Sequence, residues 1–151
     1  MLPFGVYQSR RKSSSVGSPR TFNFLGFTHY MGRNRRGQPL LGRKTERHRV
    51  QRKLKEVRDR LKSLRTQGTN AMVDYAVRHV RGHLQYYGVS GNARSIVRYW
   101  WLVRRGLFKW LNRRSQKRSL TWEKYLLLLE ARKLPKPRIV HHVYGTSNRP
   151  T

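Results

Sequence analysis

The amino-acid sequence predicts a mainly α-helical protein: a small bundle of three or four helices, preceded by a β-hairpin and by a disordered basic N-terminal segment. Apolar residues recur at helical spacing in four stretches of the chain. A short aromatic stretch with strand character precedes them, and the first residues are polar, small and basic. The expected boundaries are a flexible basic segment at 1–20, a hairpin at 21–42, a helical domain at 43–133 and an extended tail at 134–151.

The hairpin prediction rests on residues 21–42. A strand over 21–30 would place apolar side chains on both faces, because successive side chains of a strand point in opposite directions. A basic turn at 32–37 and a short strand at 38–41 would complete the hairpin. The apolar side chains are Phe22 and Phe24 on one face and Leu25 and Phe27 on the other. A lone hairpin can cover only one face, so we expect residues 1–42 to be under-packed.

Helices are expected at 45–66, 70–87, 93–114 and 121–132. Thr45, Asn92 and Thr121 are the expected N-caps, because their side chains can accept a hydrogen bond from a backbone N–H of the first turn. The expected core residues of the first three helices are Leu54, Val57, Leu61, Val77, Val80, Trp100, Leu107 and Trp110. Those of the fourth helix are Trp122, Leu126 and Leu129. Two prolines that follow this helix predict an extended tail.

The charge balance narrows the choice of partners. The chain has 35 Lys and Arg residues against 6 Asp and Glu residues, a formal net charge of +29. Such a charge opposes compaction unless a polyanion neutralises it. The candidate polyanionic partners are nucleic acid and acidic membranes. The sequence has no long apolar stretch and its aromatic residues fit a helical core, so we expect no membrane partner. The absence of Cys fits a reducing compartment, and we expect a cytoplasmic protein.

The acidic residues are too dispersed for metal-dependent chemistry on nucleic acid. No Asp or Glu lies between Asp74 and Glu123. Nucleotidyl transfer and phosphodiester cleavage need clustered carboxylates that hold Mg²⁺. His79 and His83 share a helix face, but Val80 stands where a zinc-protease helix carries its glutamate, and no third ligand is evident. We interpret both as polar residues at the surface or facing RNA, and expect no catalytic residue, no metal and no cofactor.

The positive signal for function is the interleaving of basic and aromatic residues over 75–118. Arg is more frequent than Lys there, and a guanidinium can contact phosphate with two N–H groups and stack on a base. Exposed aromatic rings can stack on unpaired bases. The candidate RNA-binding residues from this pattern are Arg78, Arg81, Tyr86, Tyr87, Arg94, Arg98, Arg104, Arg105, Arg113 and Arg114.

Several separated blocks, in order along residues 20–142, resemble the C-terminal part of bacterial-type group II intron reverse transcriptases. The stretch 21–29 (Thr-Phe-Asn-Phe-Leu-Gly-Phe-Thr-His) resembles the Phe-Leu-Gly-Phe hairpin at that family's palm–thumb junction. The stretch 80–88 (Val-Arg-Gly-His-Leu-Gln-Tyr-Tyr-Gly), followed by Asn92, resembles a signature of its maturase-specific region, domain X. The stretches 110–116, 121–123 and 134–139 continue the resemblance.

The resemblance implies an architecture and a role. Residues 21–42 would be a remnant of the reverse transcriptase palm, and residues 43–133 the thumb and maturase-specific domain. The implied function is the binding of structured intron RNA to assist splicing, and the signature block adds His83, Gln85 and Asn92 to the candidate RNA-binding residues. The family's catalytic Tyr-Ala-Asp-Asp block is absent, so polymerase activity is not implied. We therefore expect a truncated or split gene product, or a decayed remnant, of a mobile element.

Two other interpretations remain open from the sequence. The charge and size also suit a structural ribonucleoprotein component, such as a ribosomal-type RNA-binding protein. The chain could instead be the C-terminal half of a split reverse transcriptase that acts in trans with a separate chain carrying fingers and palm. Besides intron RNA, the intron's DNA target is a further candidate partner.

Overall fold

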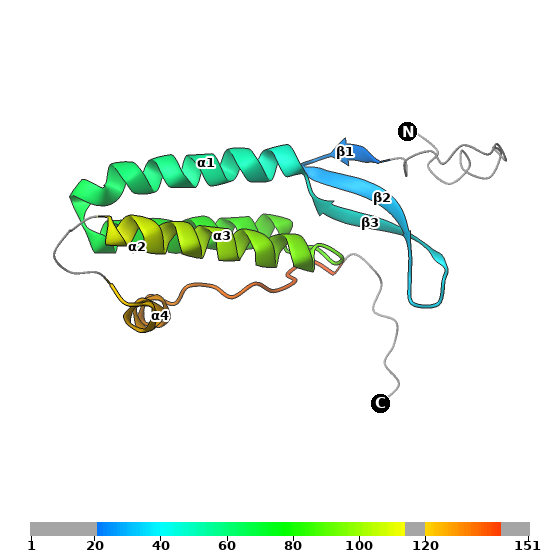
Figure 1. The fold of residues 1–151 in the computed structure, drawn as a ribbon. Helices are drawn as coiled ribbons and strands as arrows, with labels where there is room; N and C mark the ends of the chain where they lie inside the picture. Colours follow the sequence, from blue (N-terminus) through cyan, green and yellow to red (C-terminus); the bar gives the residue numbers. More distant parts are fainter. Residues whose placement is uncertain (1–20, 114–119, 143–151) are drawn as a thin grey trace, which may run out of the picture.

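The computed structural model describes residues 21–113 and 120–142, and within them a three-stranded antiparallel sheet precedes four α-helices (Figure 1). The strands are β1 (Phe22–Phe24), β2 (Phe27–Arg33) and β3 (Pro39–Thr45). The helices are α1 (Arg47–Leu64), α2 (Thr69–Tyr87), α3 (Ala93–Asn112) and α4 (Trp122–Ala131), with a 3-10 turn at Arg65–Gln67. The mainly α prediction is confirmed. The flexible segment expected at 1–20 lies outside the described residues.

The sheet has three strands where the sequence predicted two. The stretch expected as one strand turns back on itself at Leu25 and Gly26, whose φ angles are 52° and 83°. Two central residues with positive φ are the geometry of a tight two-residue hairpin turn, so β1 pairs antiparallel with β2 and Phe24 faces Phe27. The sequence did not predict this turn for two reasons. The aromatic residues alternate as in a single strand, and Leu is an uncommon residue at positive φ.

The last strand is also longer than expected. β3 pairs with β2 from Pro39 to Thr45, so the boundary between sheet and helices falls after Thr45 rather than after residue 42. The ring of Tyr30 lies over Gly42, where a Cβ atom would collide with it. Thr45 therefore ends a strand, and Glu46 takes the N-cap position of α1 without a side-chain cap.

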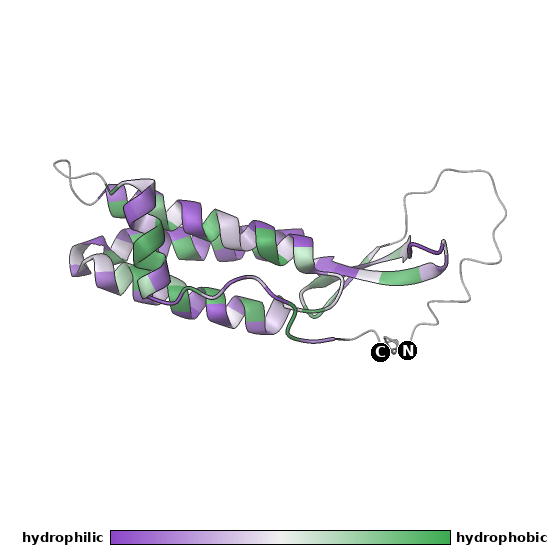
Figure 2. Ribbon diagram, turned by 90° about the horizontal axis from the view of Figure 1, so that it is seen from below, coloured by the Kyte–Doolittle hydropathy of each residue, from purple (hydrophilic) through white to green (hydrophobic). Residues whose placement is uncertain are grey.

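The three long helices pack alongside one another, and α4 crosses them (Figures 1 and 2). Figure 2 shows hydrophobic and hydrophilic residues alternating along the long helices, as expected for amphipathic helices. Of the expected core, Val57, Leu61, Val77, Val80, Leu107 and Trp110 are buried. Leu54 and Trp100 are only partly buried and pack at the edge of the core.

The short helix α4 buries a different residue from the one expected. Tyr125 has no exposed surface, whereas Leu126 is 38% exposed and Trp122 is partly buried. The Tyr125 hydroxyl donates a hydrogen bond to the backbone carbonyl of Arg104 at 2.7 Å, which satisfies the polar end of a buried ring. Leu129 is buried as expected, and Thr121 caps the helix through a bond from the Lys124 backbone N–H.

The tail after α4 is extended, as predicted, over its described part to residue 142. The indole N–H of Trp100 donates to the Pro135 carbonyl at 2.8 Å. The backbone N–H of Val140 donates to the Gly88 carbonyl at 2.7 Å, and Val89 and His141 form an isolated parallel bridge. The tail thus runs back beneath α2 and α3 towards the sheet (Figure 1). Residues 143–151 lie outside the described part of the chain.

Candidate nucleic-acid interface

Ion pairs in the described part of the structure neutralise few of the positive charges. Ion pairs join Arg49 to Glu46 at 3.5 Å and Arg132 to Asp74 at 3.3 Å. Even if each of the 6 acids paired with one cation, 35 − 6 = 29 of the cations would have no acid for a partner. A surface of this kind binds polyanions, because each contact with a phosphate releases a condensed counterion.

Eight of the residues predicted to bind RNA have exposed side chains. They are Arg78, Arg81, Gln85, Tyr86, Arg94, Arg98, Arg105 and Arg113. The first four lie on α2, and the next three lie on α3, with Arg113 just after its end. Arg114 lies outside the described residues. The exposed arginines can therefore contact phosphate without any change in the fold.

Four predicted RNA-binding residues are buried rather than exposed. Tyr87 is 4% exposed and packs against Phe27, with ring centroids 5.2 Å apart. Asn92 is 1% exposed: its amide group accepts from the Thr45 backbone N–H at 2.9 Å and donates to the Tyr87 carbonyl at 2.8 Å. Asn92 therefore links the sheet to the bundle. It stands at the N-cap position of α3, but its side chain does not cap the helix, so this prediction is wrong. The other two are His83 and Arg104.

Arg104 is enclosed by tryptophan rings. Its guanidinium carbon lies 4.2 Å from the ring centroid of Trp100, 4.7 Å from that of Trp101 and 5.5 Å from that of Trp122. These cation–π contacts hold the charge inside the junction of α3 and α4, and burial lowers the pKa of the guanidinium. Arg104 is therefore a structural residue, while Trp101 keeps 45% of its surface exposed beside it.

Two concave basic surfaces flank α1. The first, here called the α1–α2 pocket, has a volume of about 530 Å³. It is lined by Arg49, Lys53, Arg78, His79, Gly82, His83, Tyr86 and Tyr87. Three cations and four rings thus meet in one cavity. Only part of this set was expected from the sequence, because no RNA-binding residue was predicted on the first helix.

The aromatic wall of the α1–α2 pocket consists of His79, His83, Tyr86 and Tyr87, and Tyr99 packs against two of these rings. The ring of His83 stacks on that of Tyr99, with centroids 3.6 Å apart and planes 10° apart. His79 Nε2 lies 2.6 Å from the Tyr99 hydroxyl. Burial, followed by the nearby His79 and Lys53, lowers the pKa of His83 to about 3, and burial also lowers that of His79. Because these pKa values are depressed, we take His79 and His83 as neutral at physiological pH.

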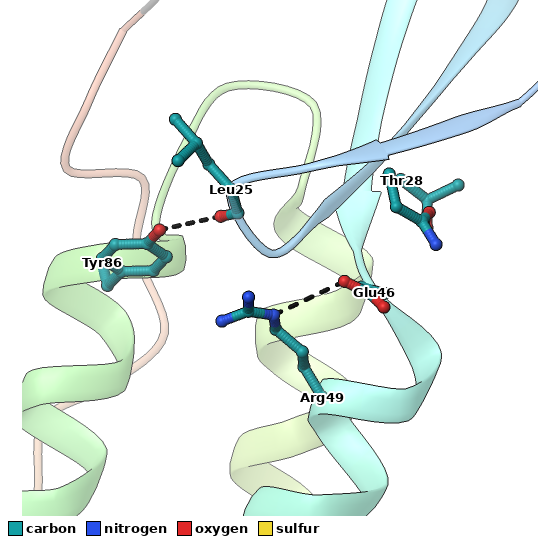
Figure 3. A network of polar contacts seen from close by, with 6 residues as sticks. Leu25, Thr28, Glu46, Arg49 and Tyr86 are labelled. Atoms are coloured by element: carbon teal, nitrogen blue, oxygen red, sulfur yellow. Dashed lines mark hydrogen bonds and ion pairs between the residues drawn. The ribbon is translucent and has the colours of Figure 1, made fainter.

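The turn between β1 and β2 lies against Tyr86 and Arg49, two residues that line this pocket (Figure 3). The Tyr86 hydroxyl donates to the Leu25 carbonyl at 2.8 Å, and the Glu46 backbone N–H donates to the Gly26 carbonyl at 2.9 Å. A Cβ atom at Gly26 would lie 2.9 Å from the Tyr87 hydroxyl, so the close approach needs glycine there. The turn therefore holds the hydroxyl of Tyr86, a lining residue of the pocket whose side chain is half exposed.

The second surface, here called the α1–α3 pocket, has a volume of about 520 Å³ and is lined by other residues of α1, beside α3. Its cations are Lys44, Arg47 and Arg98, and its other side chains include Thr28, Gln51 and Leu102. Tyr99 also contributes to its lining. Of the two pockets, this one has the fewer aromatic residues.

A signal for the missed residues exists in the sequence. Arg49 and Lys53 are four residues apart and each immediately precedes a residue of the apolar stripe, Val50 or Leu54. Residues at this spacing share a helix face, so both cations must lie along one border of the buried stripe. A cation at such a border lies beside the neighbouring helix and can line a groove between the two.

The comparisons with known proteins add no relative. No family model, no curated protein and no solved structure matches the chain. Within the described residues, no group of three His, Asp or Glu side chains is arranged to hold a metal ion. No helix of that part of the chain has the length and apolar character needed to cross a membrane.

Proposed function

We propose that this chain is a maturase-type RNA-binding fragment that binds structured intron RNA and assists its splicing, without a polymerase site of its own. The observation that carries the proposal is the pair of basic pockets flanking α1, set beside exposed arginines of α2 and α3. The choice of intron RNA comes from the resemblance of the blocks at 21–29 and 80–88 to group II intron reverse transcriptases.

The distribution of charge favours a folded RNA over a single extended strand. The exposed arginines lie on two different helices, and the two pockets are lined by different residues of α1, one set beside α2 and the other beside α3. A single strand would follow one groove, whereas a folded RNA presents phosphates in several directions at once. Arg78 and Arg81 on α2 and Arg94, Arg98 and Arg105 on α3 are the proposed phosphate contacts. Tyr86, Gln85 and Trp101 are exposed beside them and can contact bases.

Competition between RNAs tests the proposal. A labelled group II intron RNA bound to the full chain is chased with unlabelled transfer RNA at two salt concentrations. We expect the intron RNA to resist the chase at physiological salt, because shape and stacking are less sensitive to salt than phosphate contacts are. Equal competition at both concentrations would leave a non-specific basic protein and would contradict the proposal.

A second candidate function is suggested by the sheet. Phe24 is 60% exposed and Leu25 is 64% exposed, side by side at the β1–β2 turn. Exposed apolar residues of this kind favour contact with another chain, as expected for the C-terminal half of a split reverse transcriptase. Primer extension by a separate chain carrying fingers and palm, with and without this protein, tests it. A rate that does not change on addition would exclude this function.

A further inference from the structure

We propose that the α1–α2 pocket captures one unpaired nucleotide of a bound RNA, with the phosphate on Arg49, Lys53 and Arg78 and the base on the aromatic wall. The inference rests on the proposed RNA-binding function and assigns a specific ligand to one site. The pocket combines the two chemistries that a nucleotide presents, an anion and a flat ring, within about 530 Å³. Ligand pockets for small molecules span roughly 300–1,000 Å³.

The cations of this pocket are available to a ligand. Arg49, Lys53 and Arg78 have exposed side chains, although Arg49 also contacts Glu46 at 3.5 Å and hydrogen-bonds with the Tyr87 side chain. They come from two helices, so their charges converge on the space between α1 and α2. A phosphate held there would accept charge-assisted hydrogen bonds from groups that are already in place.

His83 supplies the second, independent observation. Its side chain lines the pocket and is 6% exposed, yet neither ring nitrogen has a hydrogen-bond partner. A buried polar atom without a partner is unfavourable, and such atoms in native proteins commonly meet a ligand or a water molecule. A neutral imidazole offers one donor and one acceptor, which matches the donor and acceptor edge of a base.

The pocket selects for an unpaired base by its geometry. A base in a duplex is stacked on both faces and paired along its edge, so it can reach neither the ring wall nor His83. An extruded base can stack on the half-exposed Tyr86, which the Leu25 carbonyl holds in place. Base stacking on an aromatic side chain strengthens binding by roughly 5- to 150-fold for each base.

Gly82 offers a way to close the pocket without changing its charge. A Cβ atom at Gly82, which lies on the pocket wall, would meet no atom within 4 Å. The same is true of Gly106 on α3, which does not line this pocket. Gly82→Leu should therefore fill the cavity, and Gly106→Leu is its matched control. Lys53→Ala removes one phosphate contact, and Lys55→Ala is the matched control for charge.

The experiment uses the full chain and two RNA hairpins of equal length, one fully paired and one with a single bulged 2-aminopurine. We expect the wild type to bind the bulged hairpin at least about 5-fold more tightly and to change the 2-aminopurine fluorescence. Gly82→Leu and Lys53→Ala should abolish this preference, while Gly106→Leu and Lys55→Ala should keep it. Circular dichroism confirms that each variant is folded, and for a misfolded Gly82→Leu the smaller Gly82→Ala replaces it.

The outcomes separate this inference from the proposed function. Equal affinity for the two hairpins, or a preference that survives Gly82→Leu, overturns the nucleotide pocket. If the intron RNA still resists the transfer RNA chase in that case, the proposed function stands without the pocket. If the bulge preference is present but intron RNA and transfer RNA compete equally, the result supports the nucleotide pocket and contradicts the maturase role.

Discussion

The helical bundle and the three-stranded sheet bury their apolar side chains to different extents. In the bundle, Leu61, Met72 and Tyr125 have no exposed surface. In the sheet, Phe24 and Leu25 are more than half exposed, and Phe27 is buried only where it meets the rings of Tyr86 and Tyr87. The β2–β3 hairpin extends away from the helices (Figure 1). The sheet is thus stabilised where it contacts the helices, whereas the bundle is stabilised by its own buried core.

The largest expected difference between the two regions is in stability. Leu61→Ala should lower the free energy of unfolding by about 2–5 kcal/mol, because it removes a fully buried side chain and leaves a cavity. Phe24→Ala, at an exposed position of the sheet, should change it by less than about 0.5 kcal/mol. Urea unfolding followed by circular dichroism measures both values. Similar losses for the two variants would refute the contrast.

The junction of the two regions depends on Asn92. Asn92→Ala should lower the free energy of unfolding by on the order of 3 kcal/mol, because the Thr45 backbone N–H and the Tyr87 carbonyl lose a buried partner. In this variant the rate of amide hydrogen exchange should increase more in β3 than in α2, since the junction opens before the bundle does. Asn70→Ala, on the exposed start of α2, is the control. Unchanged exchange in β3 would show that the sheet has another anchor.

The buried histidines should make the bundle sensitive to acid. His83 is neutral in the folded chain because its pKa is lowered from 6.5 to about 3. The unfolded chain therefore binds a proton that the folded chain does not. Stability from this residue is complete above pH 6.5 and declines as the pH falls towards 3, by about 2 kcal/mol at pH 5. The lowered pKa of His79 acts in the same direction.

Unfolding in urea at pH 7 and pH 5 checks this dependence. His83→Phe keeps a ring that can stack on Tyr99 and should reduce the loss at pH 5. His48→Gln changes an exposed histidine and should leave the loss as it is. A loss of equal size in both variants would mean that other groups carry the acid sensitivity.

Among residues 21–113 and 120–142, the sheet should be cut first by a protease. The turn between β2 and β3 carries Arg35 and Arg36, both exposed, at the end farthest from the helices (Figure 1). Brief digestion with a low concentration of trypsin should cleave before residue 43, while the arginines of α1 stay protected by the helix. Mass spectrometry of the fragments identifies the cuts. Uniform protection from residue 20 onwards would contradict the expectation.

The smallest expected effect is a gain in stability within the bundle. Gly106→Ala should raise the free energy of unfolding by about 0.5–1 kcal/mol, because glycine is a poor helix former and the added methyl group meets no atom within 4 Å. Thermal unfolding measures the gain. At Gly42 of the sheet the same change should destabilise, because the ring of Tyr30 occupies the space.

The helices were predictable because periodicity is a local property of the sequence. Residues such as Leu61 and Leu107 repeat at helical spacing, and the observed helix ends fall within two residues of the expected ones. The turn at Leu25 and Gly26 was not predictable from alternation, since the positive φ of Leu25 accompanies a tertiary bond from Tyr86.

The candidate site was predictable only in its charge. The exposed arginines of α2 and α3 follow from composition, since few acids are present to neutralise them. The burial of Asn92 and Arg104 does not follow, because each also needs a partner far along the chain: Thr45 for Asn92 and Trp122 for Arg104. Lys53 joins the site only when α2 packs beside α1, and this contact is also a long-range one.

The extended tail also sets the order in which the newly made chain can finish folding. The Gly88 carbonyl at the end of α2 accepts hydrogen bonds from Val140 and His141, and the Trp100 indole donates to Pro135. Thirty residues separate the end of α3 at Asn112 from His142. At roughly 5–20 residues per second, a ribosome needs about 1.5–6 s to add them. Throughout that interval α2 and α3 lack the hydrogen bonds that the tail supplies in the finished protein.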